Sequence, residues 1–568
     1  MGSTALKTRG RAQRYFALSS LQERYWFLQQ SDPANSANNI ASSFRLIGRL
    51  NLPVLVRCLS EIVRRHQVLR TVFSINHGKP VARLLPSREI LPELVDLTSA
   101  HPVERQLEAR RLAEQHATEP FDLEQGPLVR FKLLQLTAAE HWLLLGSHRI
   151  AFDAESCNVF RMELNSLYQA FSSTRWSPLL EPPIQYVDYA QRQRHWLQSD
   201  NRQQQLSYWK SRLAEAPPLL EFPTDRPRRK VSSNHVASQK VELDRELSRA
   251  LRDLASRADV TLFVTSLTAW QVLLARYSRQ ENVIVGATIP GRNHSDLKGL
   301  IGQFENRLAL RTDLSGNPTF RELLGRVCAV TLEAHAHQDL PFDMLLPKLA
   351  SERNASHNPA FQVLFAFRDM PREDSQWSEL RLHELPSEST VSPFDLSLTF
   401  DDSPNGLCGR LNYNTDLYQA ETISRLRANF QVLLAGIVAD PDQRIGELPL
   451  LTAAERQQVL VAWNQTATDD AGSGHIHQFF EEHAARTPEA IAVVSGDRQV
   501  TYRELNTRAN QLAHHLIGLG VEPETLVGLC VERSVEMIVG LLGILKAGGA
   551  YVPLDPTYPA ARLQFLWE

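Results

Sequence analysis

The first third of the chain contains a change of hydrophobic period that predicts a strand, a loop and a helix in succession. Residues 142–145 are continuously apolar, which is typical of a buried strand. Beyond residue 156, apolar residues recur at the spacing of an amphipathic helix. They are Phe160, Leu164, Leu167, Tyr168 and Phe171. Ser156 is the expected cap of this helix, and the loop before it is a place where a rigid scaffold presents side chains to a ligand.

The remaining periodicity divides the chain into two similar sets of elements. In the first set, residues 40–47 predict a strand and residues 53–65 predict a helix. Residues 216–231 are rich in proline and charge and predict a linker. The second set has a strongly apolar helix at 262–277 and a strand at 283–289, but no loop with a matching histidine and aspartate. Two related lobes with one active loop are therefore expected.

Length and composition restrict the class of protein. A chain of 568 residues is too long for one hydrophobic core, so several domains are expected. A net charge of -3 gives no excess of positive charge of the kind that binds nucleic acid or an anionic membrane. The five cysteines are far apart and match no zinc spacing. This cysteine spacing gives no reason to expect a metal site. Because no apolar run approaches the roughly 20 residues of a membrane span and residues 1–14 lack a signal-peptide pattern, we expect a cytoplasmic protein.

Residues 147–156 resemble the core motif of the condensation domains of nonribosomal peptide synthetases. That motif has two consecutive histidines, three variable residues, and then aspartate and glycine. His148 is the first histidine here and Asp153 the aspartate, whereas Arg149 replaces the second histidine and Ala154 replaces the glycine. In the family, the second histidine is the reactive one. The resemblance therefore gives Arg149 the catalytic position and gives His148 and Asp153 structural roles.

Further motifs in the family's order support this resemblance. They are Ser19, Gln22, Arg24 and Trp26, followed by residues 65–73, 186–190, 301–307, 337–342 and 358–363. An ordered series is far more specific than any one short motif. The resemblance implies an α/β fold in which two chloramphenicol-acetyltransferase-like lobes form a V-shaped pseudo-dimer with a tunnel between them.

The domain boundaries follow from these motifs and from the polar stretches between them. They are a flexible N-terminus at 1–17, an N-lobe at 18–215, a C-lobe at 216–450, a linker at 451–474 and a partial adenylation domain at 475–568. The last part resembles the start of an adenylation domain through residues 501–506 and 545–556. It stops before the Gly-rich phosphate-binding loop and the catalytic lysine, so we expect no adenylation activity from it.

The resemblance also implies the reaction and its partners. Condensation domains join an upstream acyl group to the amine of a downstream aminoacyl group, each held as a thioester on the phosphopantetheine arm of a peptidyl carrier protein. The expected partners are the upstream and downstream carriers and the adjoining adenylation domain, with no directly bound cofactor. A histidine can exchange a proton with the amine near neutral pH. Arg149 cannot, because an arginine pKa lies above about 12. His148 is expected to point to the opposite side of an extended segment and not to replace the missing group.

A buried carboxylate at Asp153 requires a cationic partner, because an unpaired one costs several kcal/mol. Residues 65–73 carry two arginines, Arg65 and Arg70, and Arg70 is the predicted partner.

Four charged residues occupy positions that are usually neutral or titratable in the family. They are Arg149, Glu155, Glu305 and Arg307, whereas the family's asparagine is kept as Asn306. One hypothesis is that the four charges meet in the tunnel, pair with one another and obstruct substrate entry. The alternative is that Glu155 and Glu305 face water.

Two functions remain open. In the first, the domain is impaired in amide formation and binds carrier proteins or recruits a tailoring enzyme, as oxygenase-recruiting relatives in glycopeptide synthetases do. Those relatives typically have an acidic residue directly after the aspartate, whereas here Ala154 comes first and Glu155 follows. In the second, it is an active condensation domain in which positioning and hydrogen bonding supply most of the rate. Epimerisation and cyclisation fit less well, because those relatives need paired histidines or an aspartate at both ends of the loop. Either function belongs to the synthesis of a secondary metabolite such as an antibiotic or a siderophore.

Overall fold

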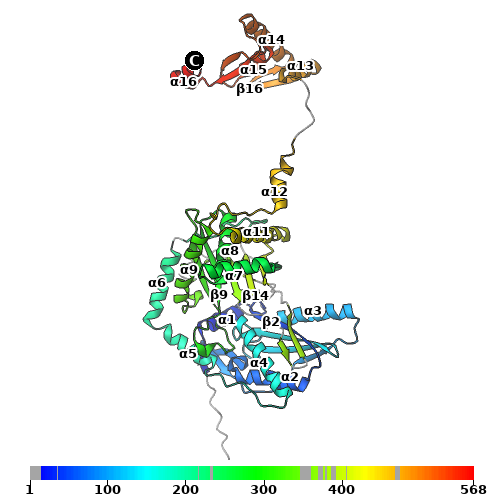
Figure 1. Cartoon of the computed structure of the whole chain (residues 1–568), viewed down its shortest axis with the longest axis vertical. Coiled ribbons are helices and arrows are strands. Elements are labelled where there is room, and N and C mark those ends of the chain that lie inside the picture. The colour runs from blue at the N-terminus through cyan, green and yellow to red at the C-terminus, as the bar shows by residue number, and fades with distance from the viewer. Residues whose placement is uncertain are drawn as a thin grey trace, which may run out of the picture. The chain divides into compact units, whose positions relative to one another are not determined.

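Two compact units make up the chain, Met1–Gln457 and Gln458–Glu568. The computed structural model describes residues 15–34, 36–214, 216–229, 235–345, 360–368, 375–377, 380–385, 392–403, 406–466 and 474–567 (Figure 1). Residues 358–359 of the last predicted motif, residues 1–14 of the predicted N-terminus and residues 467–473 of the predicted linker lie outside the described residues. Tyr15–Ala17 form strand β1, so the prediction of a flexible segment to residue 17 is wrong at its end.

The N-lobe of the first unit is built on a six-stranded sheet. Its strands are β2 (Asn39–Ile47), β5 (Glu93–Asp96), β6 (Val129–Thr137), β7 (Glu140–His148), β12 (Ser375–Trp377) and β13 (Leu380–Leu385), in the order β12-β13-β2-β7-β6-β5. A smaller sheet has the order β1-β4-β3, with β3 (Thr71–Asn76) and β4 (Lys79–Leu84). The helices are α1 (Ser20–Ser31), α2 (Leu52–Arg65), η1 (Gln67–Arg70), α3 (Pro102–Thr118), α4 (Ala154–Ser172) and α5 (Tyr186–Trp196).

The middle of strand β7, residues 142–145, is continuously apolar because both faces of the strand are buried there. Leu143 and Leu145 face the core beneath α2 and α4, whereas Trp142 and Leu144 face a second core with α3. On the first face, Phe160 of α4 stacks on Phe131 of β6 with ring centroids 5.7 Å apart. The sheet is thereby a rigid support for the loop that leaves β7 at His148.

The C-lobe of the first unit is a second six-stranded sheet covered by helices. Its strands are β8 (Val236–Glu242), β9 (Asn282–Ile289), β10 (Asn306–Asp313), β11 (Val363–Arg368), β14 (Leu396–Ser403) and β15 (Gly406–Asn414), in the order β10-β9-β11-β14-β15-β8. Its helices are α6 (Asp200–Leu213), α7 (Arg245–Arg257), α8 (Leu262–Ser278), η2 (Ser295–Leu297), α9 (Phe320–Ala336), η3 (Phe342–Met344) and α11 (Ala420–Ala439). Helices α7, α8 and α11 pack against one another (Figure 1). Helix α8 is largely apolar because its neighbours enclose it: residues 264–274 are all buried, and Leu267, Trp270 and Leu273 have no exposed surface.

The two lobes exchange elements, so the predicted boundary between residues 215 and 216 does not separate two cores. Strand β13 comes from the second half of the chain but pairs with β2 of the N-lobe sheet. Leu300 and Phe304 likewise belong to the N-lobe core, whereas Leu206 and Trp209 of α6 belong to the C-lobe core. Each lobe is therefore completed by chain from the other half.

The second unit is small. Its elements are α13 (Ile476–Arg486), β16 (Ile491–Ser495), β17 (Arg498–Thr501), α14 (Tyr502–Gly518), β18 (Leu526–Cys530), α15 (Val535–Lys546), β19 (Ala550–Leu554) and α16 (Ala560–Trp567). Strands β16 and β17 pair antiparallel, and β18 and β19 pair parallel. The predicted linker at 451–474 is partly helical, because it contains α12 (Ala453–Leu460) and η4 (Ala462–Asn464).

No single helix among the described residues has the length and apolarity to cross a membrane. One pair, α7 and α8, passes that test jointly by length and composition but is bent by 107° between its members.

The exchange of β13 makes a prediction for N-lobe stability. Leu382 of β13 is only 2% exposed and lies in the N-lobe core. Leu382→Ala is expected to lower the free energy of unfolding by about 2 to 5 kcal/mol, because it leaves a cavity in that core. The measurement is urea unfolding followed by tryptophan fluorescence. Arg381→Ala, at an exposed position of the same strand, is the matched control, and an equal effect of both changes would contradict the exchange.

Candidate functional site

The loop between β7 and α4 is fixed first by its own helix cap. Asp153 is the N-cap residue of α4, and its carboxylate accepts a hydrogen bond from the backbone N–H of Ser156 at 2.8 Å. Aspartate at this position satisfies one of the unpaired N–H groups of the first helical turn. The prediction that Ser156 caps the helix is therefore wrong, because Ser156 lies inside the first turn.

Asp153 also forms a buried ion pair with Arg292, which follows strand β9. The two guanidinium nitrogens lie 2.8 and 2.9 Å from the two carboxylate oxygens. The side chains of Arg292 and Asp153 are 4% and 1% exposed. The backbone N–H groups of Phe304 and Glu305 donate to the same carboxylate at 3.0 and 3.3 Å. Both carboxylate oxygens are thus fully occupied by donors, as a buried charge requires.

The prediction that Arg70 pairs with Asp153 is wrong. Arg70 donates instead to the backbone carbonyls of Leu85 at 2.7 Å and Arg64 at 3.5 Å. The true partner is Arg292, which is separated from Asp153 by 139 residues of sequence. Its only sequence signal was its place directly after a predicted strand and Pro290–Gly291, and that signal does not identify the carboxylate it meets.

Further hydrogen bonds hold the residue 301–306 segment against the loop. The Ser156 hydroxyl lies 3.0 Å from both the N–H and the carbonyl of Gly302. With its amide nitrogen facing the loop, Gln303 donates to the carbonyls of Arg149 at 3.1 Å and Phe152 at 3.0 Å. A Cβ at Gly302 would lie 2.2 Å from the ring of Tyr186, so only glycine allows this close approach.

His148 is fully buried and both of its ring nitrogens are engaged. Nδ1 accepts from the N–H of Ile150 at 3.1 Å, and Nε2 lies 3.3 Å from the Gln29 side-chain oxygen. This pattern corresponds to the neutral tautomer with its proton on Nε2. Burial, together with the positive charge of Arg149, lowers the pKa of His148 to about 3. His148 is therefore a neutral residue that fixes the end of β7.

Arg149, unlike the buried His148, has a partly exposed side chain and carries a permanent charge. Its backbone N–H donates to the carbonyl of Asn38 at 2.8 Å. Its Nη1 lies 4.0 Å from a carboxylate oxygen of Glu305, and the two side chains are 32% and 15% exposed. Burial opposes the charge, but Tyr25, Glu305 and Asp153 outweigh this effect and raise the pKa of Arg149 above its ordinary value.

The other predicted charges do not join this pair. Glu155 accepts a hydrogen bond from Asn158 at 3.1 Å, and the Arg307 guanidinium lies over the ring of Phe394 at 5.2 Å. Ala154 is exposed at the start of α4. Two of the four charged residues therefore meet and the other two lie elsewhere.

Asn306 connects this region to the segment 337–342. Its amide nitrogen donates to the carbonyls of Gln338 and Leu340, both at 2.9 Å, and its oxygen accepts from the N–H of Phe342 at 3.0 Å. All three contacts require the geometry of an amide, which both donates and accepts. Two motifs that are distant in sequence thus form one structural unit.

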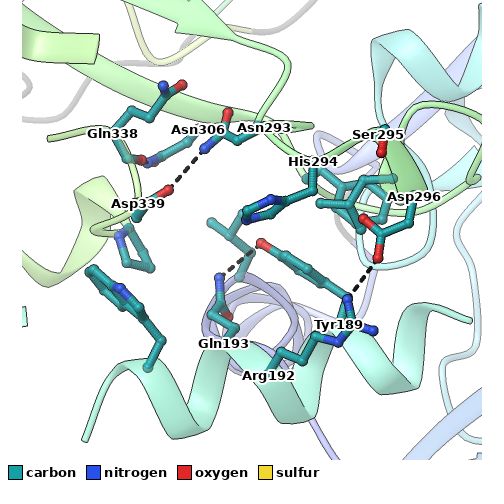
Figure 2. A pocket seen from close by; sticks show the side chains of 16 residues that line it. Tyr189, Arg192, Gln193, Asn293, His294, Ser295, Asp296, Asn306, Gln338 and Asp339 are labelled. Atoms are coloured by element: carbon teal, nitrogen blue, oxygen red, sulfur yellow. Dashed lines mark hydrogen bonds and ion pairs between the residues drawn. The ribbon is translucent and has the colours of Figure 1, made fainter. Parts of the chain in front are cut away.

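A cavity of about 680 Å³ lies beside this unit, between α1 and α5 on one side and the segment after β9 on the other (Figure 2). Phe304 and Asn306, on either side of Glu305, line it. Two hydrogen-bonded pairs lie in its wall. Arg192 donates to Asp296 at 2.7 Å, and Asn293 donates to Asp339 at 2.9 Å (Figure 2). Among the described residues, no cluster of three or more His, Cys, Asp or Glu side chains could hold a metal ion.

Comparison with protein families gives two matches. The model of the condensation domain matches residues 12–460, and the model of the AMP-binding enzymes matches residues 480–568. A linear gramicidin synthase of Brevibacillus parabrevis is 43% identical over 551 residues, which are 97% of this chain and 11% of that protein. The chain therefore spans about a tenth of the length of this relative.

Several solved structures are similar to this chain, among them an X-domain and a four-domain synthetase. The X-domain from teicoplanin biosynthesis matches with a TM-score of 0.68 and 28% identity, over 79% of this chain and 100% of that domain. The same X-domain has also been solved in complex with OxyB. A holo four-domain nonribosomal peptide synthetase bound to AMP and glycine matches with a TM-score of 0.76 and 25% identity, over 99% of this chain and 43% of that protein.

The ion pair of Asp153 predicts a specific energetic coupling. Asp153→Asn is expected to lower the free energy of unfolding by about 3 to 5 kcal/mol, because it leaves Arg292 charged and buried without a counter-ion. Double-mutant cycles with Arg292→Met and with Arg70→Met, measured by urea unfolding, separate the two candidate partners. The coupling energy should be about 1 kcal/mol or more for Arg292 and within about 0.5 kcal/mol of zero for Arg70. A larger coupling with Arg70 would refute the assignment.

The neutral state of His148 predicts a dependence of stability on pH. Its pKa is lowered from 6.5 to about 3, so the unfolded state binds more protons between these values. Stability should be unaffected by this group above pH 6.5 and should fall as the pH decreases from 6.5 toward 3. Urea unfolding at a series of pH values measures this dependence, whose slope reports how many more protons the unfolded state binds than the folded state. His148→Gln should lower that number by up to one. His101→Gln, at an exposed site, serves as the control, and equal slopes for native and His148→Gln would contradict the burial of a neutral imidazole.

Proposed function

Because the chain belongs to the condensation-domain family and continues into the start of an AMP-binding enzyme domain, we propose that it receives carrier-bound thioesters but is impaired in amide formation. In this proposal the partners are upstream and downstream peptidyl carrier proteins, each of which presents its substrate on a phosphopantetheine arm. The domain then serves as a platform for carriers or for a tailoring enzyme that acts in trans.

The observation that carries the proposal is the absence of a usable proton acceptor on the β7–α4 loop, all of whose residues the structure describes. Amide formation needs an unprotonated amine beside the thioester carbonyl and a group that takes up its proton. Both ring nitrogens of His148 are engaged inside the protein, and Arg149 is a cation with no acceptor atom. The carboxylate of Glu305, beside the loop, faces this cation.

The Arg149–Glu305 pair adds a second obstacle. A substrate that enters between them must separate two partly buried opposite charges, and the attraction between such charges grows as water is excluded. Replacing Arg149 alone would leave Glu305 without its partner. Restoring amide formation therefore requires changes at both positions.

The cavity beside Asn306 supports binding of a carrier arm. A phosphopantetheine arm is a flexible chain with two amide groups, and the side-chain amides of Gln193, Asn293 and Gln338 line the cavity (Figure 2). Amide side chains both donate and accept hydrogen bonds, so they suit a ligand of this kind. The arm carries the thioester, and the side chains that line the cavity hold the arm in place.

Similarity to the X-domain supports recruitment of a tailoring enzyme. That domain has been solved in complex with OxyB from teicoplanin biosynthesis, and it aligns with 80% of this chain at 28% identity. We extend only the general role to this chain, which is to offer a folded surface to an enzyme acting on carrier-bound substrate.

A second candidate function is amide formation through the charged pair itself. The Arg149 side chain is 32% exposed, so its guanidinium could donate hydrogen bonds to a developing oxyanion. Glu305 would then hold the incoming ammonium group before it loses its proton.

A mass-spectrometric assay of amide formation separates these functions. Donor and acceptor carriers are chemically loaded, and the native chain is compared with Arg149→His, Glu305→Val and the double variant. We expect native rates close to the uncatalysed rate and an increase of at least about tenfold in the double variant, because a positioned acid–base group contributes about 10²- to 10⁴-fold. Arg307→Gln, which removes a nearby charge outside the pair, is the control. Native amide formation well above the uncatalysed rate would refute the impaired function, and its loss in Glu305→Val would favour the charged-pair mechanism.

A further inference from the structure

A second cavity, of about 240 Å³, lies in the N-lobe and shares no lining residue with the first. Its walls are mainly apolar and come from α2, η1, β3, the segment after β4 and the segment that enters β6. Six of the apolar side chains are Val63, Leu69, Val72, Leu85, Ile90 and Leu128. Arg70 and Arg88 line the same cavity.

Arg70 is a half-buried cation without a counter-ion among the described residues. Its two terminal nitrogens donate to backbone carbonyls, and its Nε is buried without a hydrogen-bond partner. Burial and the charge of Arg64 both lower the pKa of Arg70. Two other buried arginines differ, because Arg65 pairs with Glu163 and Arg292 pairs with Asp153. An anion is therefore the group that would balance the charge of Arg70.

The shape and polarity of the cavity define the rest of the ligand. A dry apolar cavity of roughly 150 Å³ can hold a benzene molecule, so 240 Å³ is enough for a chain of roughly six to eight carbons. Arg88 is exposed and provides a second positive charge where the cavity meets solvent. The ligand is therefore apolar along most of its length and anionic at one end.

We propose that this cavity binds an aliphatic carboxylate, with its chain among the apolar side chains and its carboxylate between Arg70 and Arg88. Arginine is suited to this role because its planar fork matches a carboxylate with two parallel hydrogen bonds. The site is independent of the amide-forming function, since neither Arg149 nor Glu305 lines the cavity.

An occupant would nevertheless touch the backbone that supports the β7–α4 loop. Leu128 lines the cavity, and its carbonyl accepts from the Ser147 hydroxyl at 2.7 Å and from the His148 N–H at 3.4 Å. The proposed ligand would thus contact Leu128, whose carbonyl is hydrogen-bonded to the end of β7.

Isothermal titration calorimetry of the full chain with octanoate tests the proposal. Native protein should bind octanoate, and 1-octanol or acetate should bind at least tenfold more weakly, because each lacks one half of the recognised chemistry. Arg70→Gln should weaken octanoate binding at least tenfold and the exposed-site variant Arg88→Gln at least threefold. Arg105→Gln is the matched control, since Arg105 also donates to backbone carbonyls but lies outside the cavity, and it should change the affinity less than twofold.

Three results would overturn the proposal. They are no octanoate binding by the native chain, equal binding of octanol and octanoate, and equal loss of binding in Arg105→Gln and the two cavity variants. Thermal melts of every variant check that the fold is kept. If Arg70→Gln does not fold, Arg88→Gln decides the outcome, and unchanged affinity in that variant then rejects the site.

Discussion

The ion pair between Asp153 and Arg292 is the contact on which the site depends. Removing two charges from water costs several kcal/mol per ion, and the cost is offset only if every donor and acceptor is satisfied. Here the same carboxylate caps α4, receives both guanidinium nitrogens and accepts two backbone N–H groups. One side chain therefore sets the start of a helix in one lobe and the course of a backbone segment from the other. Glu305 reaches Arg149 because its own N–H is bound to Asp153.

Exchange of elements gives this contact its rigidity. The N-lobe sheet is extended by β13 from late in the sequence, and the N-lobe core includes Leu300 and Phe304 from the segment that carries Arg292. In return, Trp209 of α6 is buried in the C-lobe core. A motion that separated the lobes would expose apolar surface in both cores and break a buried ion pair. The loop and its partner segment are thus held in one arrangement.

Charge at the site is fixed and does not titrate near neutral pH. His148 is kept neutral by burial and by the adjacent cation, whereas Arg149 is a permanent cation whose pKa Tyr25 and Glu305 raise further. Two neighbouring residues thus have opposite electrostatic behaviour because one lies inside the core and the other reaches a partly open space. A site of this kind binds and orients polar groups well, but proton transfer requires a group that gains and loses a proton at working pH.

The sequence alone determined the elements and the family. Continuous apolar character predicted β7, the 3.6-residue period predicted α4, and the ordered motifs identified the condensation domain, because these signals are local or depend only on order along the chain. Tertiary structure alone decided which charges meet. Arg70 lies in a motif of the family, whereas Arg292 only follows a predicted strand, and nothing local identifies which of them meets Asp153. Folding brings Arg292 across 139 residues to Asp153 and leaves Arg70 beside an apolar cavity. The same is true of the four charged departures from the motif, of which only Arg149 and Glu305 approach each other, because pairing depends on distance in space and not on position in sequence.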